Sequence, residues 1–478
     1  MSDELIARFT ATVEASLGLR IPGNDRIHLE RQINQAAVEK GFPDGAHFVD
    51  WLASSPPDRG TIELLAGHLT VGETYFYRDA ETFRILTDRI VPEIAAKRRA
   101  EGRILRIWSA GCATGEEPYS IAVLLHEALP DVSDWNVTIL ATDVNPLFLA
   151  KATSGVYRDW SFRDAPTWLK SKYFMPRADG ILEILPSLRT WVDFRVLNLA
   201  EGGYPSLASN TNAMDLVFCR NVLMYFSPAV AREVVRRIAL SLVDGGVLVA
   251  SPSELPLVSE AASPLEKLPD SCLLRKGAPA AFLAVVTEDP PDLPVPYESP
   301  SRGEPPKAAQ SPRSGIERAE ALYGEGLYER AVETVLGLPG DALGEPVALM
   351  LLARSYANMG SLDRAQEWCQ KAVQADKLKP FPHYLLATIL DERGDRERAE
   401  RELERVLYAD PDFILAHFAL GHMALRQGRA GEGKRRLGTA RTLLQGCRAE
   451  DMVPESEGTS VGRLSQTIDA LLEGGGEP

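Results

Sequence analysis

Residues 108–120, with the sequence WSAGCATGEEPYS, constrain the fold of this chain more than any other segment. The apolar run at residues 104–107 predicts a short buried strand, and the pattern becomes helical from Pro118 onward. Gly111 and Gly115 lie in the loop between them, where a missing Cβ lets the main chain bend and approach a ligand. A strand, a glycine-containing loop and a helix in this order are typical of nucleotide-binding α/β folds.

Two adjacent carboxylates, Glu116 and Glu117, follow this loop directly. They would repel a pyrophosphate, so the pattern favours a ligand that is cationic or neutral at this point. Asp143 ends the second predicted strand, where an acid accepts hydrogen bonds from ribose hydroxyls in related folds. S-adenosylmethionine carries a sulfonium, an ammonium group and ribose hydroxyls, and therefore fits this polarity. Two simpler roles stay open: the glutamates as first-turn acids that stabilise a helix dipole, and Asp143 as the cap of the helix that begins at Pro146.

Residues 104–286 alternate between apolar strands and helical stretches, which predicts a doubly wound, Rossmann-like α/β sheet. The predicted strands are residues 105–109, 137–142, 192–196, 215–219, 246–250 and 281–286. Residues 1–90 have a helical pattern, with Phe9 and Val13 at helical spacing. We therefore expect an N-terminal helical subdomain at residues 1–90 and a ligand-binding domain at residues 91–286.

The C-terminal part of the chain repeats itself every 34 residues. Three rows of small residues carry the period: Gly326, Gly360, Gly394 and Gly428; Ala319, Ala353, Ala387 and Gly421; Ala331, Ala365, Ala399 and Gly433. Small side chains at fixed positions let two helices approach closely, and glycine permits a sharp turn between them. This pattern resembles the tetratricopeptide repeat (TPR) and implies an all-α array at residues 314–447.

Two further segments flank the predicted array. Residues 287–313 are rich in proline, which predicts an extended linker. Residues 448–478 predict a terminal cap or tail with one short helix at residues 461–472.

Composition excludes several classes of function. The net charge of −15 argues against non-specific binding to nucleic acid or to anionic membranes, both of which need a basic field. No apolar run approaches the roughly 18 residues that span a bilayer, and no secretory signal pattern opens the sequence. The five cysteines are widely spaced, which predicts reduced thiols and no metal site. We therefore expect a cytoplasmic protein that neither inserts into membranes nor binds nucleic acid.

Four motifs in order carry a resemblance to a known family. They are LTVGETYFYRD at residues 69–79, WSAGCATGEEPYS at residues 108–120, ATDVNP at residues 141–146 and FCRNVLMYF at residues 218–226. Residues 1–286 with these motifs resemble the chemotaxis receptor methyltransferases of the CheR type, and the repeats resemble the TPR-fused versions of that family. The resemblance implies an S-adenosylmethionine-dependent methyltransferase domain with a small β-subdomain. It also implies a protein-glutamate O-methyltransferase that acts on the cytoplasmic helices of chemoreceptors, while the TPR array binds a protein partner or regulates access.

The resemblance also implies roles for individual residues. Thr74 and Arg78 match positions at the methionine end of the cofactor, and Arg78 is our candidate for orienting the incoming carboxylate. Of the two glutamates, we favour Glu116 over Glu117 as the contact to the cofactor, and Asp143 is expected to bind the ribose. The remaining expected positions are Gly72 and Gly111 beside the cofactor; Asn198, Leu199, Arg220 and Asn221 around the adenine and the floor of the site; and Tyr225 at the substrate entrance. For Arg220, a purely structural ion pair is an equal alternative.

The chain departs from the family pattern in two places. Gly72 stands where many members have asparagine, which predicts the loss of one side-chain hydrogen bond to the cofactor. In addition, the segment KYFMPRADGILEI at residues 172–184 is shorter than in members that bind a tethering pentapeptide at the receptor C-terminus. We therefore expect a pentapeptide-independent enzyme.

Two other functions remain as alternatives. The same fold could methylate a nucleic acid or a small molecule, although the acidic charge disfavours nucleic acid. Alternatively, the catalytic domain could be vestigial and the repeats could act as a scaffold. The presence of five expected site residues argues against the scaffold: Thr74, Arg78, Glu116, Asp143 and Asn221.

Overall fold

The computed structural model of the chain describes residues 1–21, 26–54, 57–261, 265–269, 271–277, 312–449, 451–456 and 458–474. The strand predicted at residues 281–286, and the predicted linker up to residue 311, lie outside the described residues. No helix among those that are described is long and apolar enough to cross a membrane.

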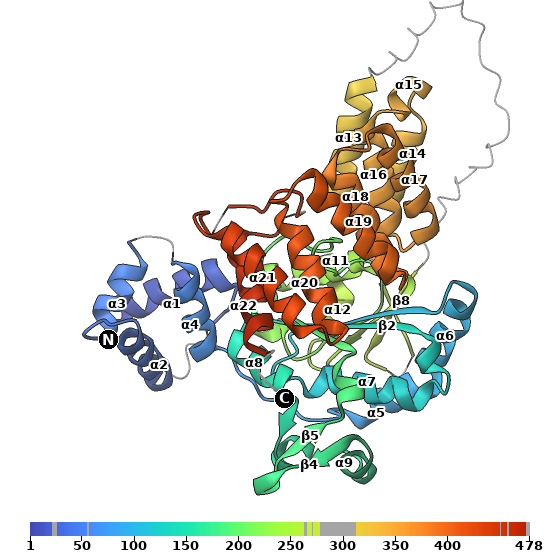
Figure 1. The fold of residues 1–478 in the computed structure, drawn as a ribbon. Helices are drawn as coiled ribbons and strands as arrows, with labels where there is room; N and C mark the ends of the chain where they lie inside the picture. Colours follow the sequence, from blue (N-terminus) through green and yellow to red (C-terminus); the bar gives the residue numbers. More distant parts are fainter. Residues whose placement is uncertain are drawn as a thin grey trace, which may run out of the picture.

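Four helices form the N-terminal part of the molecule, drawn in blue in Figure 1. They are α1 (Asp3–Leu17), α2 (Arg26–Glu39), α3 (Gly45–Leu52) and α4 (Arg59–Leu69). The side chains of Ser2, Asp44 and Asp58 accept backbone N–H groups at the starts of α1, α3 and α4, which fixes where these helices begin. Phe9 and Val13 lie buried in the cluster that the four helices enclose.

A seven-stranded sheet with the order β6-β2-β1-β7-β8-β10-β9 forms the centre of the molecule. The parallel strands are β6 (Val192–Val196), β2 (Asn136–Asp143), β1 (Ile104–Ala110), β7 (Met214–Cys219) and β8 (Leu242–Ala250). The antiparallel strands β10 (Leu273–Lys276) and β9 (Leu265–Lys267) complete one edge. The predicted α/β fold is confirmed.

Helices cover both faces of this sheet, so its strands are apolar on both sides. Ile107 and Ile139 face one core together with α6 and α7, whereas Trp108 and Leu140 face a second core together with α11 and α12. The helices around the sheet are α5 (Ala80–Ile85), a π-helical turn (Leu86–Ile90), α6 (Val91–Ala100), α7 (Glu116–Ala128), α8 (Pro146–Ser154), α11 (Pro228–Ser241) and α12 (Leu255–Ala261). Alternation between the two cores follows from the two-residue period of a strand.

A small antiparallel sheet projects from this domain between β2 and β6, as the lower part of Figure 1 shows. Its strands, in the order β3-β5-β4, are β3 (Val156–Tyr157), β4 (Phe174–Pro176) and β5 (Leu182–Ile184), and α9 (Thr167–Tyr173) and α10 (Pro186–Arg189) flank them. The Arg177 N–H donates to the Ile181 carbonyl (2.8 Å), which closes a tight connection between β4 and β5. The predicted small β-subdomain is therefore present.

The repeats form four helix pairs with the predicted period. Their helices are α13 (Pro312–Gly324), α14 (Tyr328–Leu336), α16 (Pro346–Asn358), α17 (Leu362–Ala375), α18 (Pro380–Glu392), α19 (Arg396–Ala409), α20 (Ile414–Arg426) and α21 (Ala430–Leu444). The four turn glycines, Gly326, Gly360, Gly394 and Gly428, all have φ between +74° and +82°, a conformation that favours glycine. A short helix, α15 (Gly340–Leu343), precedes the second pair, and a terminal helix, α22 (Val461–Gly474), follows the fourth.

The repeat turns pack against the N-terminal ends of the parallel strands. Glu392, at the end of α18, accepts a hydrogen bond from Asn212 Nδ2 (3.4 Å) on its side chain and one from Asn136 Nδ2 (2.8 Å) on its carbonyl. The Arg106 guanidinium of β1 lies 3.6 Å from the Glu392 carboxylate, and both side chains are almost fully buried. A buried ion pair of this kind makes the contact specific, because either charge alone would be costly to bury.

A second polar contact joins the last repeat to the edge strand β6. His422 Nε2 of α20 lies 3.2 Å from Asp193 Oδ1, and Arg195 pairs with the same carboxylate at 2.7 Å. Burial alone would raise the pKa of Asp193, but Arg195 and His422 overcome this effect and hold the pKa well below its usual range. Asp193 therefore stays ionised at neutral pH as the partner of the repeat array.

Candidate active site

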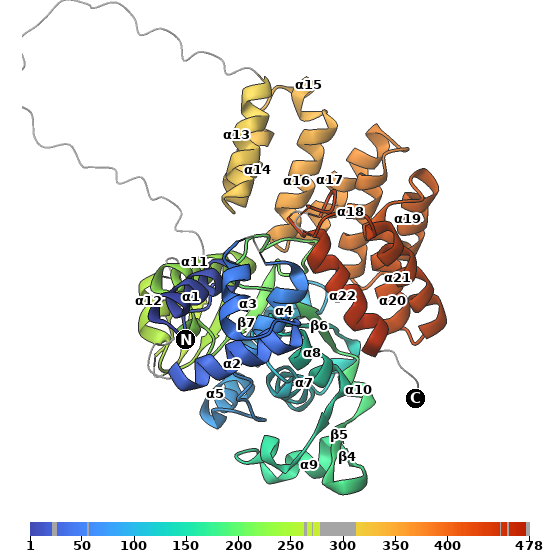
Figure 2. The ribbon, with the colours of Figure 1, turned by 90° about the vertical axis from the view of Figure 1, so that its left-hand side faces the viewer.

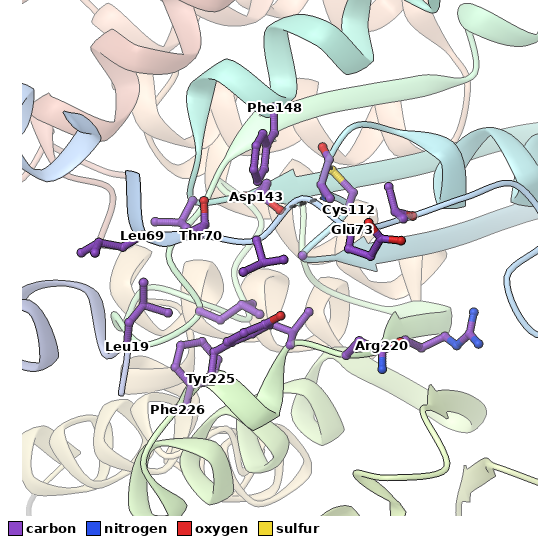
Figure 3. A pocket seen from close by; sticks show the side chains of 18 of the residues that line it. Leu19, Leu69, Thr70, Glu73, Cys112, Asp143, Phe148, Arg220, Tyr225 and Phe226 are labelled. Atoms are coloured by element: carbon purple, nitrogen blue, oxygen red, sulfur yellow. Dashed lines mark hydrogen bonds between the residues drawn. The ribbon is translucent and has the colours of Figure 1, made fainter. Parts of the chain in front are cut away.

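A cavity of about 340 Å³ opens at the C-terminal ends of the parallel strands, opposite the end of the sheet that contacts the repeats. Its walls come from the loops after β1, β2, β6 and β7, from residues 69–78 and from the N-terminal helices. Figure 3 shows Asp143 and Phe148 on one side of this cavity and Tyr225 and Phe226 on the opposite side. Open α/β sheets bind their ligands at this edge, where the strand order reverses between neighbours such as β1 and β7.

The loop after β1 needs glycine at residue 111. Gly111 has φ +79°, and a Cβ there would lie 2.3 Å from the Val222 side chain. Its N–H donates to the Thr142 carbonyl (2.8 Å), which ties the loop to the end of β2. Gly111 thus lets the loops after β1 and β7 approach each other and form one wall of the cavity.

Asp143 lines the cavity and also organises it. One carboxylate oxygen accepts the Ala113 N–H (2.9 Å), and the other accepts the Asn145 N–H (2.9 Å). Burial raises the pKa of Asp143, and these backbone donors oppose that shift. The cap of α8 is Asn145, whose side chain accepts the Leu147 N–H, so Asp143 is not the cap.

The two adjacent glutamates face different surroundings. Glu116 is buried away from the cavity, where its carboxylate accepts hydrogen bonds from Ser161 Oγ (2.8 Å) and Thr114 Oγ1 (2.6 Å). Glu117 lines the cavity, and its carboxylate accepts a hydrogen bond from Ser109 Oγ (2.7 Å). Of the two, the structure places Glu117 rather than our preferred Glu116 on the cavity wall, because successive residues of a helix point about 100° apart.

Burial raises the pKa of Glu117, although the nearby Arg220 opposes the shift. A carboxylate in such surroundings gains from a second cationic partner, because opposite charge at short range compensates desolvation. Glu117 is thus suited to hold a positively charged group of a ligand.

Gly72 does not line the cavity. Residue 72 is glycine because the Phe148 ring packs closely against it. A Cβ at residue 72 would lie 2.7 Å from the Phe148 ring, which itself lines the cavity. Gly72, expected beside the cofactor, therefore packs against Phe148 and is not on the cavity wall. The chain has a ring from α8 packed over Gly72 at this point, so an asparagine would not fit without displacing the ring.

Thr74, Arg78 and Arg220 meet on the cavity wall. The Arg78 guanidinium donates to the Glu73 carbonyl (3.0 Å) and, within the described part of the chain, forms no ion pair. Arg220 donates to the Arg78 carbonyl (2.8 Å) and lies 3.7 Å from the Glu117 carboxylate. Arg220 is thus a structural ion-pair partner that also lines the cavity.

The loops after β6 and β7 complete the lining with Asn198, Leu199, Asn221 and Tyr225. Asn198 Oδ1 accepts the Ala200 N–H (3.0 Å), which shapes the first of these loops. Asn221 has φ +58°. Burial raises the pKa of Tyr225 further above neutral pH, where a tyrosine phenol is already protonated. All the predicted site residues except Gly72 and Glu116 therefore line one cavity.

Comparison with known proteins identifies the family. The family model for the CheR methyltransferase SAM-binding domain matches residues 72–266. Two family models for the tetratricopeptide repeat match residues 347–377 and 380–405. A chemotaxis protein methyltransferase of Borreliella burgdorferi is 32% identical over 226 residues, which are 47% of this chain and 78% of that protein. Chemotaxis protein methyltransferase 1 of Pseudomonas aeruginosa is 32% identical over 252 residues, 52% of this chain and 88% of that protein.

This chain belongs to the CheR family. A further relative, the probable biofilm formation methyltransferase WspC of Pseudomonas aeruginosa, is 27% identical over 433 residues, 90% of this chain and 96% of that protein. The similarity to WspC thus extends through the repeats as well as the methyltransferase domain.

The cavity of this CheR protein fits S-adenosylmethionine, the cofactor of the family. Asp143 and Glu117 place two carboxylates on its wall, and the volume suits a small organic ligand. Arg220 Nε is a buried donor without a hydrogen-bond partner among the described residues. Since buried donors are normally satisfied, this one is consistent with a ligand acceptor close by.

Sequence reasoning missed two contributors to the site. Glu254 is buried beneath the loop after β7, where its carboxylate accepts the N–H groups of Asn221 (2.7 Å) and Met224 (3.3 Å). A weak signal was available, because Glu254 lies in the short loop after the strand predicted at residues 246–250. The second contributor is the N-terminal part of the chain, which brings Leu19, just after α1, and Gln32 of α2 to the cavity through contacts that local sequence does not reveal.

Proposed function

We propose that this protein transfers the methyl group of S-adenosylmethionine to glutamate side chains of chemoreceptors and produces methyl esters. The observation that carries the proposal is the Arg78 guanidinium at the cavity, which forms no ion pair with the described residues. Such a cation is suited to attract and orient an acceptor carboxylate. The relatives named as chemotaxis methyltransferases support the same substrate class.

The residues of the cavity suggest how the reaction proceeds. A glutamate carboxylate is ionised at pH 7, so no general base is required. Arg78 would hold one carboxylate oxygen in line for attack, while Leu19, Phe83 and Phe226 exclude water from the cavity. Tyr225, protonated at neutral pH, would donate a hydrogen bond at the substrate entrance.

S-adenosylmethionine supplies an electrophilic methyl group when it is bound. We propose that Asp143 accepts hydrogen bonds from the ribose hydroxyls and that Glu117 pairs with the ammonium group. Asn198 and Leu199 line the part of the cavity proposed for the adenine, and Thr74 lines the part proposed for the methionine end.

The affinity for S-adenosylmethionine should depend on pH through Glu117. The pKa of Glu117 is raised, so protonation begins above the usual glutamate value of about 4.3 and removes the charge that attracts the ammonium group. We expect the dissociation constant, measured by calorimetry, to rise as the pH falls from 7.5 towards 5, on the order of 10-fold. Glu117→Gln should bind weakly at every pH and lose most of this dependence; a wild-type pH profile in that variant would contradict the role.

We also propose that the enzyme does not need a tethering pentapeptide. The tight connection that closes between β4 and β5 at Arg177 and Ile181 supports this, because it provides little extra chain to grip a peptide. Calorimetry with a receptor C-terminal pentapeptide should show no saturable binding at about 100 μM, a concentration far above tight-binding ranges. Micromolar binding would overturn this proposal.

The repeats support a role in protein interaction. We propose that residues 1–90, 91–286 and 314–447 act as three functional units and that residues 448–478 cap the array. Because the match to WspC spans these repeats, receptors of a biofilm-type signalling system are the substrates we would examine first.

Incubation with methyl-labelled S-adenosylmethionine and receptor-containing membranes tests the proposed function. We expect label on the receptor that mild base releases as methanol. Label on nucleic acid or on a small molecule would favour the other methyltransferase functions, and cofactor binding without transfer would favour a scaffold.

A further inference from the structure

The C-terminal segment of the chain covers one face of the last repeat. Side chains from this segment and from the last helix pair form one buried cluster, which includes Leu415, Phe418, Leu437, Val453, Val461, Leu464 and Ile468. Val453, in the loop before α22, is 2% exposed, whereas the preceding residue, Met452, is 62% exposed. The segment is therefore seated on the repeat through one apolar side.

The 34-residue period identifies the equivalent residues in the other repeats, so their exposure can be compared. The first helices α16, α18 and α20 begin 34 residues apart, so Val347, Phe381 and Leu415 occupy equivalent positions on what we call the first-helix face. Val347 is 50% exposed and Phe381 is half-buried, but Leu415 is only 4% exposed. Leu415 shares a buried cluster with Val453, Val461 and Leu464 of the C-terminal segment, whereas Val347 and Phe381 lie outside that cluster. Solenoid repeats bind peptides on continuous surfaces of this kind.

The same segment also contacts the methyltransferase domain. Figure 2 shows α22 between the repeats and the elements α8 and β6, and α22 packs against both of them. Gln466 of α22 also donates to the Glu63 carboxylate of α4 (2.5 Å). A terminal helix that only capped the solenoid would not need these contacts.

Helices α4 and α8 lead directly to the cofactor cavity. Phe148 of α8 lines it, and Thr70, the residue after α4, lines it as well. Asn145 Nδ2 at the start of α8 donates to Thr70 Oγ1 (2.9 Å), which joins the two helices. Displacement of α22 would remove a support that both helices share.

We propose that the first-helix face of the last repeat is a peptide-binding site that residues 451–456 and 458–468 of the same chain occupy. A partner with a short apolar, helix-forming segment would compete for this site. Because α22 supports α4 and α8, release of the segment weakens cofactor binding. By linkage, the cofactor must strengthen the seating of the segment by the same factor.

Two adjacent substitutions in the full-length protein test the site. Val453→Asp places a carboxylate in the apolar contact, whereas Met452→Asp places the same group in solvent. The probe is a fluorescent synthetic peptide with the sequence of residues 448–474. We expect it to bind Val453→Asp at least about 10-fold more tightly than it binds the wild type or Met452→Asp, because the competing segment is released. Equal, weak binding to all three folded proteins would overturn the proposed site.

Calorimetry with S-adenosylmethionine tests the link to the cavity. We expect Val453→Asp to bind the cofactor about 3- to 10-fold more weakly than Met452→Asp does. Saturating cofactor should strengthen peptide binding to Val453→Asp by the same factor, because the bound peptide supplies the α22 sequence that supports α4 and α8. Unchanged affinities would overturn the link. If Val453→Asp does not fold, amide hydrogen exchange of the wild type tests the link instead. The link predicts that bound cofactor slows exchange in both α8 and α22. This link rests on the cavity being the cofactor site; a wild type that does not bind S-adenosylmethionine would contradict that assignment, whereas the peptide experiment would still stand.

Discussion

Replacement of Asp143 with alanine should raise the dissociation constant for S-adenosylmethionine about 100-fold or more. The carboxylate is proposed to bind the ribose, and it also accepts the N–H groups of Ala113 and Asn145 that shape the cavity wall. Hydrogen bonds to a charged group contribute about 1.5–3 kcal/mol each. The loss of the two proposed hydrogen bonds to the ribose hydroxyls is therefore sufficient for this effect. Calorimetry with S-adenosylmethionine measures it directly.

Asp143→Asn serves as the matched control for shape. Its amide oxygen can still accept one backbone N–H, so the loop should be better preserved while the negative charge is lost. We expect an intermediate loss of affinity and a melting temperature close to that of the wild type. Wild-type affinity in both variants would remove Asp143 from the cofactor site.

Arg78→Lys should lower kcat about 100-fold and change the affinity for S-adenosylmethionine less than about 3-fold. Lysine keeps the charge, but it lacks the planar fork that fixes the direction of a carboxylate. Arg78→Ala should be slower still. Steady-state methylation of a receptor fragment gives kcat, and calorimetry gives the affinity for the cofactor.

The separation of these two measurements makes the test specific. A general structural role would lower cofactor affinity and rate together, because Arg78 lies beside Thr74 and Arg220 in the cavity wall. Full activity in Arg78→Lys would show that the residue does not orient the acceptor.

Local sequence predicted the elements that depend on local chemistry. The strand, loop and helix around Gly111 follow from apolar pattern and glycine, and the repeat turns follow from a glycine every 34 residues. Asp143 could be placed at the cavity because a residue that ends a parallel strand lies at the binding edge of the sheet.

The remaining features depend on contacts between distant residues. The choice between Glu116 and Glu117 depends on how α7 is rotated about its own axis relative to the cavity. Two adjacent acidic residues in the sequence do not reveal that rotation. The packing of Phe148 over Gly72 joins two motifs about 75 residues apart in the chain, beyond the reach of any local pattern.

The position of the repeats was equally hidden. The linker composition predicts an extended connection, yet Arg106 of β1 and Glu392 of α18 form a buried pair between the two parts of the molecule. Their sequences show only a charge in a strand and a charge at a helix end. Complementarity between two such surfaces appears only once both are folded.

Mass spectrometry of a receptor cytoplasmic fragment, after incubation with S-adenosylmethionine and this protein, tests the central claim most directly. The proposal predicts one or more glutamate side chains converted to methyl esters by the wild type, and a strongly reduced yield with Arg78→Ala under the same conditions. A receptor that stays unmodified while S-adenosylmethionine is bound, or a methyl group on any residue other than glutamate, would contradict it.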